Sequence, residues 1–208
     1  MPVSIEKLVL TPRLPFGRRA NTGRRTALPN AYSAIWRTVL PLTLGTSLAA
    51  QSTDTDAKIL NFFLLLEHVQ EGFYREAVET GRLTGDLLEY ATTVGEQESE
   101  HVAFLADWLG SRARPLPKLS FQDRLATSER FRDTAIDLEE AALAGYIGQG
   151  ANLTRDTITS VATLVSVEAR QAAWVRALAG VSPAPRAADP ARDADRVVED
   201  LRKWGYVA

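Results

Sequence analysis

Four glutamates interrupt stretches of the chain that are otherwise apolar and helical in pattern. Read at a spacing of about 3.6 residues, each apolar stripe carries one glutamate near its middle. The stripes are Leu60, Phe63, Glu67 and Tyr74; Ala91, Val94, Glu98, His101 and Leu105; Ala135, Leu138, Glu139, Ala142 and Tyr146; and Val161, Leu164, Glu168, Gln171 and Val175. Because an apolar stripe packs into a protein core, all four carboxylates are expected in the interior.

Buried carboxylates need a compensating charge. Burying an unpaired carboxylate costs on the order of several kcal/mol, and four that converge also repel one another. The stripes contain too few cationic residues to pair with them. Two divalent ions would offset four negative charges, so the pattern predicts a metal site. Since the chain has no cysteine and only two histidines, its ligands must be mainly carboxylates.

Polar neighbours of the glutamates repeat in two patterns. A tyrosine follows seven residues later, two turns along the same face, in Glu67/Tyr74 and Glu139/Tyr146. A polar side chain follows three residues later in Glu98/His101 and Glu168/Gln171. The tyrosines are interpreted as core aromatics whose hydroxyl groups support a ligand carboxylate. The repetition indicates two helical hairpins built on one design.

The elements that must position these residues are helices. Capping residues and glycines place them at about residues 52–81, 86–110, 127–150 and 154–180, with a short amphipathic helix within 191–207. Two connections are short, and the third, around residues 112–123, contains two prolines. The pattern predicts an all-α fold, an antiparallel four-helix bundle with one long crossover and a short C-terminal helix.

Three segments resemble a known family. LNFFLLLEHVQEGFY, EQESEHVAFL and VEARQAAWVRAL are similar to bacterial ferritin-like domain proteins related to plant desiccation-related proteins, within the ferritin-like superfamily of di-metal carboxylate proteins. The resemblance covers about residues 55–180. It implies a ferritin-like bundle whose centre holds two iron or manganese ions.

The resemblance also implies a ligand set. The matching ligand positions are Glu67, Glu98, His101, Glu139 and Glu168. Glu98 and Glu168 would bridge the two ions, and His101 would cap one of them. Gln171 stands where the family has a second histidine, so it is a weak ligand at most, and the second ion is expected to bind more weakly. Gln70 and Glu71 follow Glu67 closely enough to approach the site, and the rim is the favoured position for both.

The first fifty residues differ from the rest of the chain. Residues 1–50 carry a net charge of +6 and the remainder carries −8. Arg24 and Arg25 begin a segment that resembles a twin-arginine export signal, and residues 38–50 are uncharged but too short to span a membrane. The alternative is a basic arm, so export to the periplasm or cell envelope and retention in the cytoplasm both stay open. The predicted division is a basic extension over 1–50, the bundle over 51–180, and a linker with the short helix over 181–208.

Two functions fit these observations. The first is a non-haem metal protein that acts on oxygen, peroxide or free Fe(II), for which an oxidase, ferroxidase or peroxide-consuming activity stays open. The second is a non-enzymatic stress or scaffold protein with a degenerate metal site, for which Gln171 is the argument. No aromatic cluster suggests nucleic-acid binding, and no transmembrane anchor is expected. An oligomer is compatible with the sequence, which does not specify one.

Overall fold

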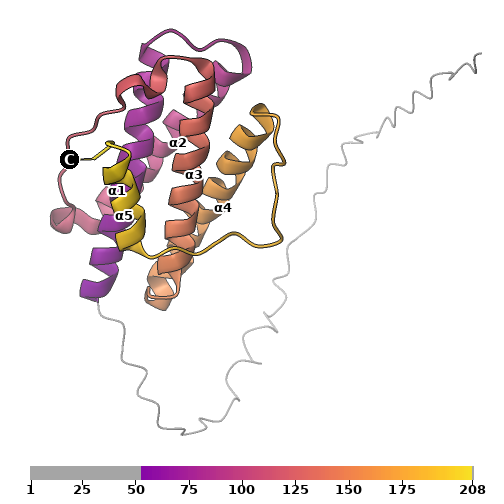
Figure 1. The fold of residues 1–208 in the computed structure, drawn as a ribbon. Coiled ribbons are helices and arrows are strands. Elements are labelled where there is room, and N and C mark those ends of the chain that lie inside the picture. The colour runs from indigo at the N-terminus through magenta and orange to yellow at the C-terminus, as the bar shows by residue number, and fades with distance from the viewer. Residues whose placement is uncertain (1–52, 208) are drawn as a thin grey trace, which may run out of the picture. The chain divides into compact units, whose positions relative to one another are not determined.

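The computed structural model describes residues 53–207, and within this range the chain is helical (Figure 1). Its long helices are α1 (Thr53–Glu79), α2 (Gly85–Leu109), α3 (Ser128–Gly150) and α4 (Arg155–Leu178), and α5 (Ala194–Lys203) is short. The described residues form no strand, only an isolated bridge between Leu119 and Val207. The prediction of an all-α helical bundle is confirmed. The predicted basic extension and export signal lie outside the described residues.

The short connections bring helices together in pairs. α1 packs most extensively on α2, and α3 packs on α4, as expected for two hairpins. The turn after α1 contains Gly81 at φ 63°, and the turn after α4 contains Gly180 at φ 73°, a left-handed conformation that glycine adopts without strain. At the start of α3, the Thr127 side chain accepts a hydrogen bond from the backbone N–H of Arg130. Local sequence signals therefore set the ends of these helices.

The crossover between α2 and α3 lies against the bundle and is held at several points. It contains two short 3-10 helices, η3 (Gly110–Arg112) and η4 (Gln122–Leu125). Asn61 of α1 donates to the carbonyl of Arg112 at 3.0 Å and accepts from the N–H of Arg114 at 2.7 Å. Ser120 donates its N–H to the carbonyl of Tyr206 at 3.2 Å. The crossover is thus fixed from α1 on one side and from the segment after α5 on the other.

The core has apolar ends and a polar middle. Every residue of the four predicted stripes is buried, including the four glutamates and Gln171.

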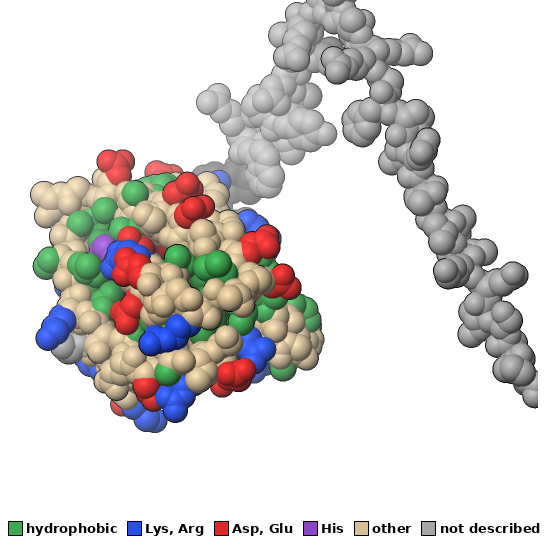
Figure 2. All heavy atoms as spheres, turned by 90° about the horizontal axis from the view of Figure 1, so that it is seen from above, with side chains coloured by type: hydrophobic (Ala, Val, Ile, Leu, Met, Phe, Trp, Pro, Cys, Tyr) green, Lys and Arg blue, Asp and Glu red, His purple; other side chains and the backbone are tan. Residues whose placement is uncertain are grey.

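None of the described helices is both long enough and apolar enough to cross a membrane. On the face shown in Figure 2, acidic and basic side chains are interspersed among hydrophobic ones rather than sorted by sign.

Gly148 marks a close approach between α3 and the linker that precedes α5. A Cβ atom added at Gly148 would lie 2.0 Å from the backbone oxygen of Arg192, whose N–H donates to Ala144 at 2.9 Å. Gly148→Ala should therefore displace the linker and lower the free energy of unfolding by about 1–3 kcal/mol. Gly150→Ala is the matched control, because its Cβ would meet only Ile158 at 3.9 Å. Chemical denaturation measures both, and equal stability of the two variants would contradict the prediction.

Candidate metal centre

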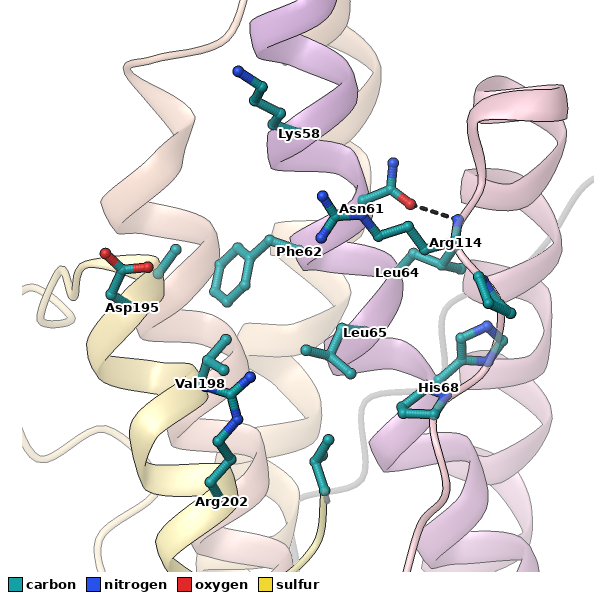
Figure 3. A pocket seen from close by; sticks show the side chains of 14 residues that line it. Lys58, Asn61, Phe62, Leu64, Leu65, His68, Arg114, Asp195, Val198 and Arg202 are labelled. Carbon is teal, nitrogen blue, oxygen red and sulfur yellow. Dashed lines mark hydrogen bonds between the residues drawn. The ribbon is translucent and has the colours of Figure 1, made fainter.

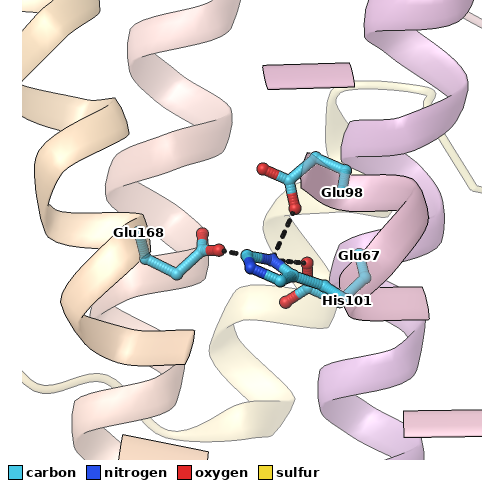
Figure 4. A group of neighbouring side chains, drawn as sticks. All are labelled: Glu67, Glu98, His101 and Glu168. Atoms are coloured by element: carbon cyan, nitrogen blue, oxygen red, sulfur yellow. Dashed lines mark hydrogen bonds and ion pairs between the residues drawn. The ribbon is translucent and has the colours of Figure 1, made fainter. Parts of the chain in front are cut away.

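Three helices bring four of the predicted ligands together. Glu67 comes from α1, Glu98 and His101 come from α2, and Glu168 comes from α4 (Figure 4). One ligand atom of each lies within 4.8 Å of those of the other three. The three glutamates are 0 % exposed and His101 is 8 % exposed. The group is therefore almost completely removed from solvent.

His101 lies between the three carboxylates. Its Nδ1 is 3.1 Å from Glu67 Oε2, 3.1 Å from Glu98 Oε2 and 3.2 Å from Glu168 Oε1. An imidazole Nδ1 carries at most one hydrogen, which cannot point at three oxygens. Glu168 Oε1 and Glu98 Oε1 have no hydrogen-bond partner although both are buried. The group thus contains more acceptors than donors.

Two tyrosines support the glutamates of α1 and α3, each from the opposite helix. The Tyr146 hydroxyl of α3 donates to Glu67 Oε1, and the Tyr74 hydroxyl of α1 donates to Glu139 Oε1. Both rings are buried, and the Tyr74 hydroxyl also lies 3.1 Å from the hydroxyl of Tyr90. This crossed pair fixes one oxygen of each carboxylate. The other oxygen of Glu139, Oε2, is buried without a hydrogen-bond partner.

Glu139 and Gln171 lie outside the group of four. Both are buried, Glu139 on α3 and Gln171 on α4. The Gln171 amide donates from Nε2 to Gln97 Oε1 at 3.0 Å, and its Oε1 has no hydrogen-bond partner. The structure therefore brings together the ligands expected around His101. On the Gln171 side, Glu139 Oε2 and Gln171 Oε1 have no hydrogen-bond partner, and these residues do not join the group of four.

Comparison with known protein families identifies the family of this chain. The family model described as the ferritin-like domain matches residues 55–181, which include all the residues of the group and also Glu139 and Gln171. The chain belongs to the ferritin-like family. No curated protein matches the chain.

Gln70 reaches the site in this ferritin-like chain, which the sequence analysis leaves open while favouring the rim. The expectation that it lies at the rim is wrong, because it is 1 % exposed and donates from Nε2 to Glu168 Oε2 at 3.2 Å. Its Oε1 has no hydrogen-bond partner. The signal was present in the sequence, since Gln70 follows Glu67 by three residues, the spacing that joins Glu98 to His101. Gln70 positions a carboxylate of α4 from α1.

Burial and mutual repulsion raise the pKa of three carboxyl groups of the ferritin-like site. Burial raises the pKa of Glu98 well above its usual range, and the charges of Glu168 and Glu67 raise it further. Burial, followed by the charge of Glu168, also raises the pKa of Glu139 well above its usual range. For Glu168, burial and the charge of Glu67 raise the pKa to about 7. Without a metal, Glu98 and Glu139 therefore hold their protons to higher pH than ordinary glutamates do.

His101 and Glu67 form the charged pair within this group. Burial alone would lower the pKa of His101, but the carboxylates of Glu168, Glu67 and Glu98 outweigh it and raise the pKa to about 12. Burial acts to raise the pKa of Glu67, but hydrogen bonds from His101, Glu98 and Tyr146 outweigh it, and the pKa is lowered. Glu67 therefore favours its ionised form beside the imidazolium of His101, whereas the other carboxyl groups favour their protonated forms.

The residues present fit a divalent cation. Glu98 Oε1, Glu139 Oε2 and Glu168 Oε1 are buried acceptors without hydrogen-bond partners, and such oxygens bind hard cations. Oxygen ligands with one imidazole suit iron, manganese or zinc. Binding of a cation would replace the protons that now neutralise the site, so its affinity should rise with pH.

The metal-free protein should lose stability as pH rises. Glu168 binds its proton more tightly in the folded state, so its contribution falls between pH 4.5 and about 7. His101 acts in the same direction above its unfolded pKa of 6.5, because its folded pKa is raised to about 12. The lowered pKa of Glu67 matters only at more acidic pH. Thermal unfolding in a chelator should show a loss of at least about 1 kcal/mol between pH 5 and pH 8.

Glu168→Gln provides the control for this pH dependence. The amide keeps the shape of the side chain and does not titrate, so the variant should lose less stability over the same pH range. A melting temperature that rises between pH 5 and pH 8 in the metal-free, unmodified protein would contradict the interpretation.

Proposed function

We propose that this ferritin-like chain binds one or two non-haem metal ions, iron or manganese, at the centre of its bundle and serves in the handling of iron or oxidative stress. The observation that supports it most directly is the convergence of three carboxylate oxygens, at 3.1–3.2 Å, on the single Nδ1 of His101. Hydrogen bonding alone does not satisfy this arrangement. A cation would satisfy it, because each carboxylate could then face a positive charge directly.

The proposed roles of the residues follow from their placement. Glu67 and His101 would bind the first ion, and Glu98 and Glu168 would be shared between two ions. Glu139 would bind the second ion through Oε2, the oxygen that the Tyr74 hydroxyl leaves without a partner. Bound iron or manganese would supply electron exchange with oxygen or peroxide. The surrounding chain excludes water and holds the carboxylates in place through Tyr74, Tyr146 and Gln70.

The second candidate is a non-enzymatic member of the family, a stress or scaffold protein of the desiccation-related kind with a degenerate site. One observation favours it. The amide of Gln171 is engaged by Gln97 at 3.0 Å and offers only a neutral oxygen on the side of the second ion. In this case the His101 side would hold one ion or none, and the bundle would act through its surface.

Removal of Glu98 tests the metal site directly. Glu98→Ala should weaken Fe(II) and Mn(II) binding by more than about 100-fold, because both proposed ions share this carboxylate. Glu100→Ala is the matched control, since Glu100 is an exposed residue on the same helix and should leave binding unchanged. Calorimetric titration of chelator-treated protein measures both. Because burial and neighbouring charges disfavour the ionised form of Glu98 in the metal-free protein, the metal-free variant should remain folded by circular dichroism. Unchanged metal affinity in Glu98→Ala would contradict the proposed site.

Metal loading in the presence of oxygen separates the two candidates. The chelator-treated protein is loaded with Fe(II), and absorbance follows oxidation while elemental analysis counts the metal retained. Two ions per chain with rapid oxidation would exclude the degenerate site. Absence of Fe, Mn and Zn binding would exclude the metal-handling function. Anomalous scattering from soaked crystals would identify the ions at Glu67 and Glu139.

Gln171→His tests the asymmetry between the two ions. An imidazole at this position should increase affinity for the second ion by about tenfold or more, because it replaces a neutral amide oxygen by a stronger ligand. The first ion, on the His101 side, should be unaffected. Two-site titration measures both affinities. Equal occupancy of two sites in the unmodified protein would show that the asymmetry argument is wrong.

A further inference from the structure

A groove of about 720 Å³ runs along the outer side of α1, between the crossover and α5 (Figure 3). Its walls come from three parts of the chain: the first half of α1, residues 114–117 of the crossover, and α5 with Val207. None of the proposed metal ligands lines it. Pockets of this volume are typical of sites for small molecules. The groove is therefore a second candidate site, separate from the metal centre.

The floor of this groove is apolar. Phe62 and Leu65 of α1 and Val198 of α5 form its centre, and Pro115 and Pro117 line the crossover side. Leu65 and Val198 are partly buried residues that pack against the core while contributing surface to the groove. Such a floor favours an aliphatic group over a polar one.

Cationic side chains surround the floor. Lys58, Arg114 and Arg202 line the groove with one carboxylate, Asp195, which gives a local net charge of +2. None of these four side chains belongs to the ion pairs formed within residues 53–207. Figure 3 shows Arg114 and Arg202 extending over the groove from opposite sides. Because residues 51–208 carry a net charge of −8, this cationic groove stands out from its surroundings.

The shape of the groove is held by hydrogen bonds. The Asn61 side chain accepts from the N–H of Arg114 at 2.7 Å and donates to the carbonyl of Arg112 at 3.0 Å, which sets the crossover wall. The wall at α5 is tied to the crossover by the bridge between Leu119 and Val207. A ligand would therefore enter a largely preformed site, which reduces the entropic cost of binding.

We propose that this groove binds a linear aliphatic carboxylate of medium chain length. The carboxylate group would pair with Arg114 and Arg202, with Lys58 at the rim, and the hydrocarbon chain would lie on Phe62, Leu65 and Val198. A purely apolar ligand would leave the cations without partners, and a small inorganic anion would leave the apolar floor in water. The basic segment 1–50 is a poor occupant, because its net charge of +6 would be repelled.

Three probes that share a twelve-carbon chain test this assignment on the full-length protein. Dodecanoate, dodecanol and dodecyltrimethylammonium are titrated below their micelle-forming concentrations, with binding followed by calorimetry. Dodecanoate should bind one molecule per chain, and dodecanol should bind at least about tenfold more weakly. The cationic probe should bind most weakly. Decanoate should bind up to about fifteenfold more weakly than dodecanoate, because each buried methylene contributes about fourfold in affinity.

Substitutions of arginines test whether dodecanoate binds in the groove. Arg114→Gln combined with Arg202→Gln should weaken dodecanoate binding by about tenfold, and both positions are exposed, so the fold should not change. Arg186→Gln, which removes an exposed arginine outside the groove, is the matched control. Arg24→Gln combined with Arg25→Gln tests whether the basic segment binds the probe instead. The proposal is overturned if dodecanoate does not bind, if the three probes bind equally, or if only the Arg24 and Arg25 variant loses binding.

Discussion

The structure depends on how carboxyl groups are accommodated in a helical core. Four helices each contribute a buried glutamate, and the ordinary solution of pairing with lysine or arginine is not used for the group around His101. One imidazolium, two tyrosine hydroxyls and one glutamine amide contact these carboxyl groups, and the raised pKa values of Glu98, Glu139 and Glu168 favour their protonated forms. Such a core is poorly stabilised at its middle and relies on the apolar layers above and below it. A site of this kind is typical of a binding function rather than of structural support.

Much of this arrangement could be predicted from the sequence, because helical periodicity decides which face is buried. All the residues of the four stripes are buried, including Tyr74 and Tyr146. Periodicity does not decide which way a long polar side chain extends. It therefore leaves both the site and the rim open for Gln70, and it does not indicate the bond between Gln97 and Gln171. The groove depends on the packing of three segments distant in sequence, about which local patterns carry no information.

The two hairpins show where a repeated design has diverged. Their crossed tyrosine bonds are equivalent, since each joins α1 to α3 and supports one glutamate. The two hairpins differ three residues after Glu98 and Glu168, where the first has His101 and the second has Gln171. His101 gathers three carboxylates, whereas the amide of Gln171 turns to Gln97. Two similar hairpins therefore present different polar side chains to the centre of the bundle.

The bridge between Leu119 and Val207 also has a consequence for the order of folding. It joins residues far apart in the chain, and it lies on the same crossover that must be positioned between the two hairpins. During synthesis, α1 and α2 can pair as soon as both have left the ribosome, because their contacts are close in sequence. The crossover gains its last restraint only after α5 and Val207 have been made. Closure of the groove is therefore expected to be among the latest events of folding, after the carboxylate core has already been enclosed.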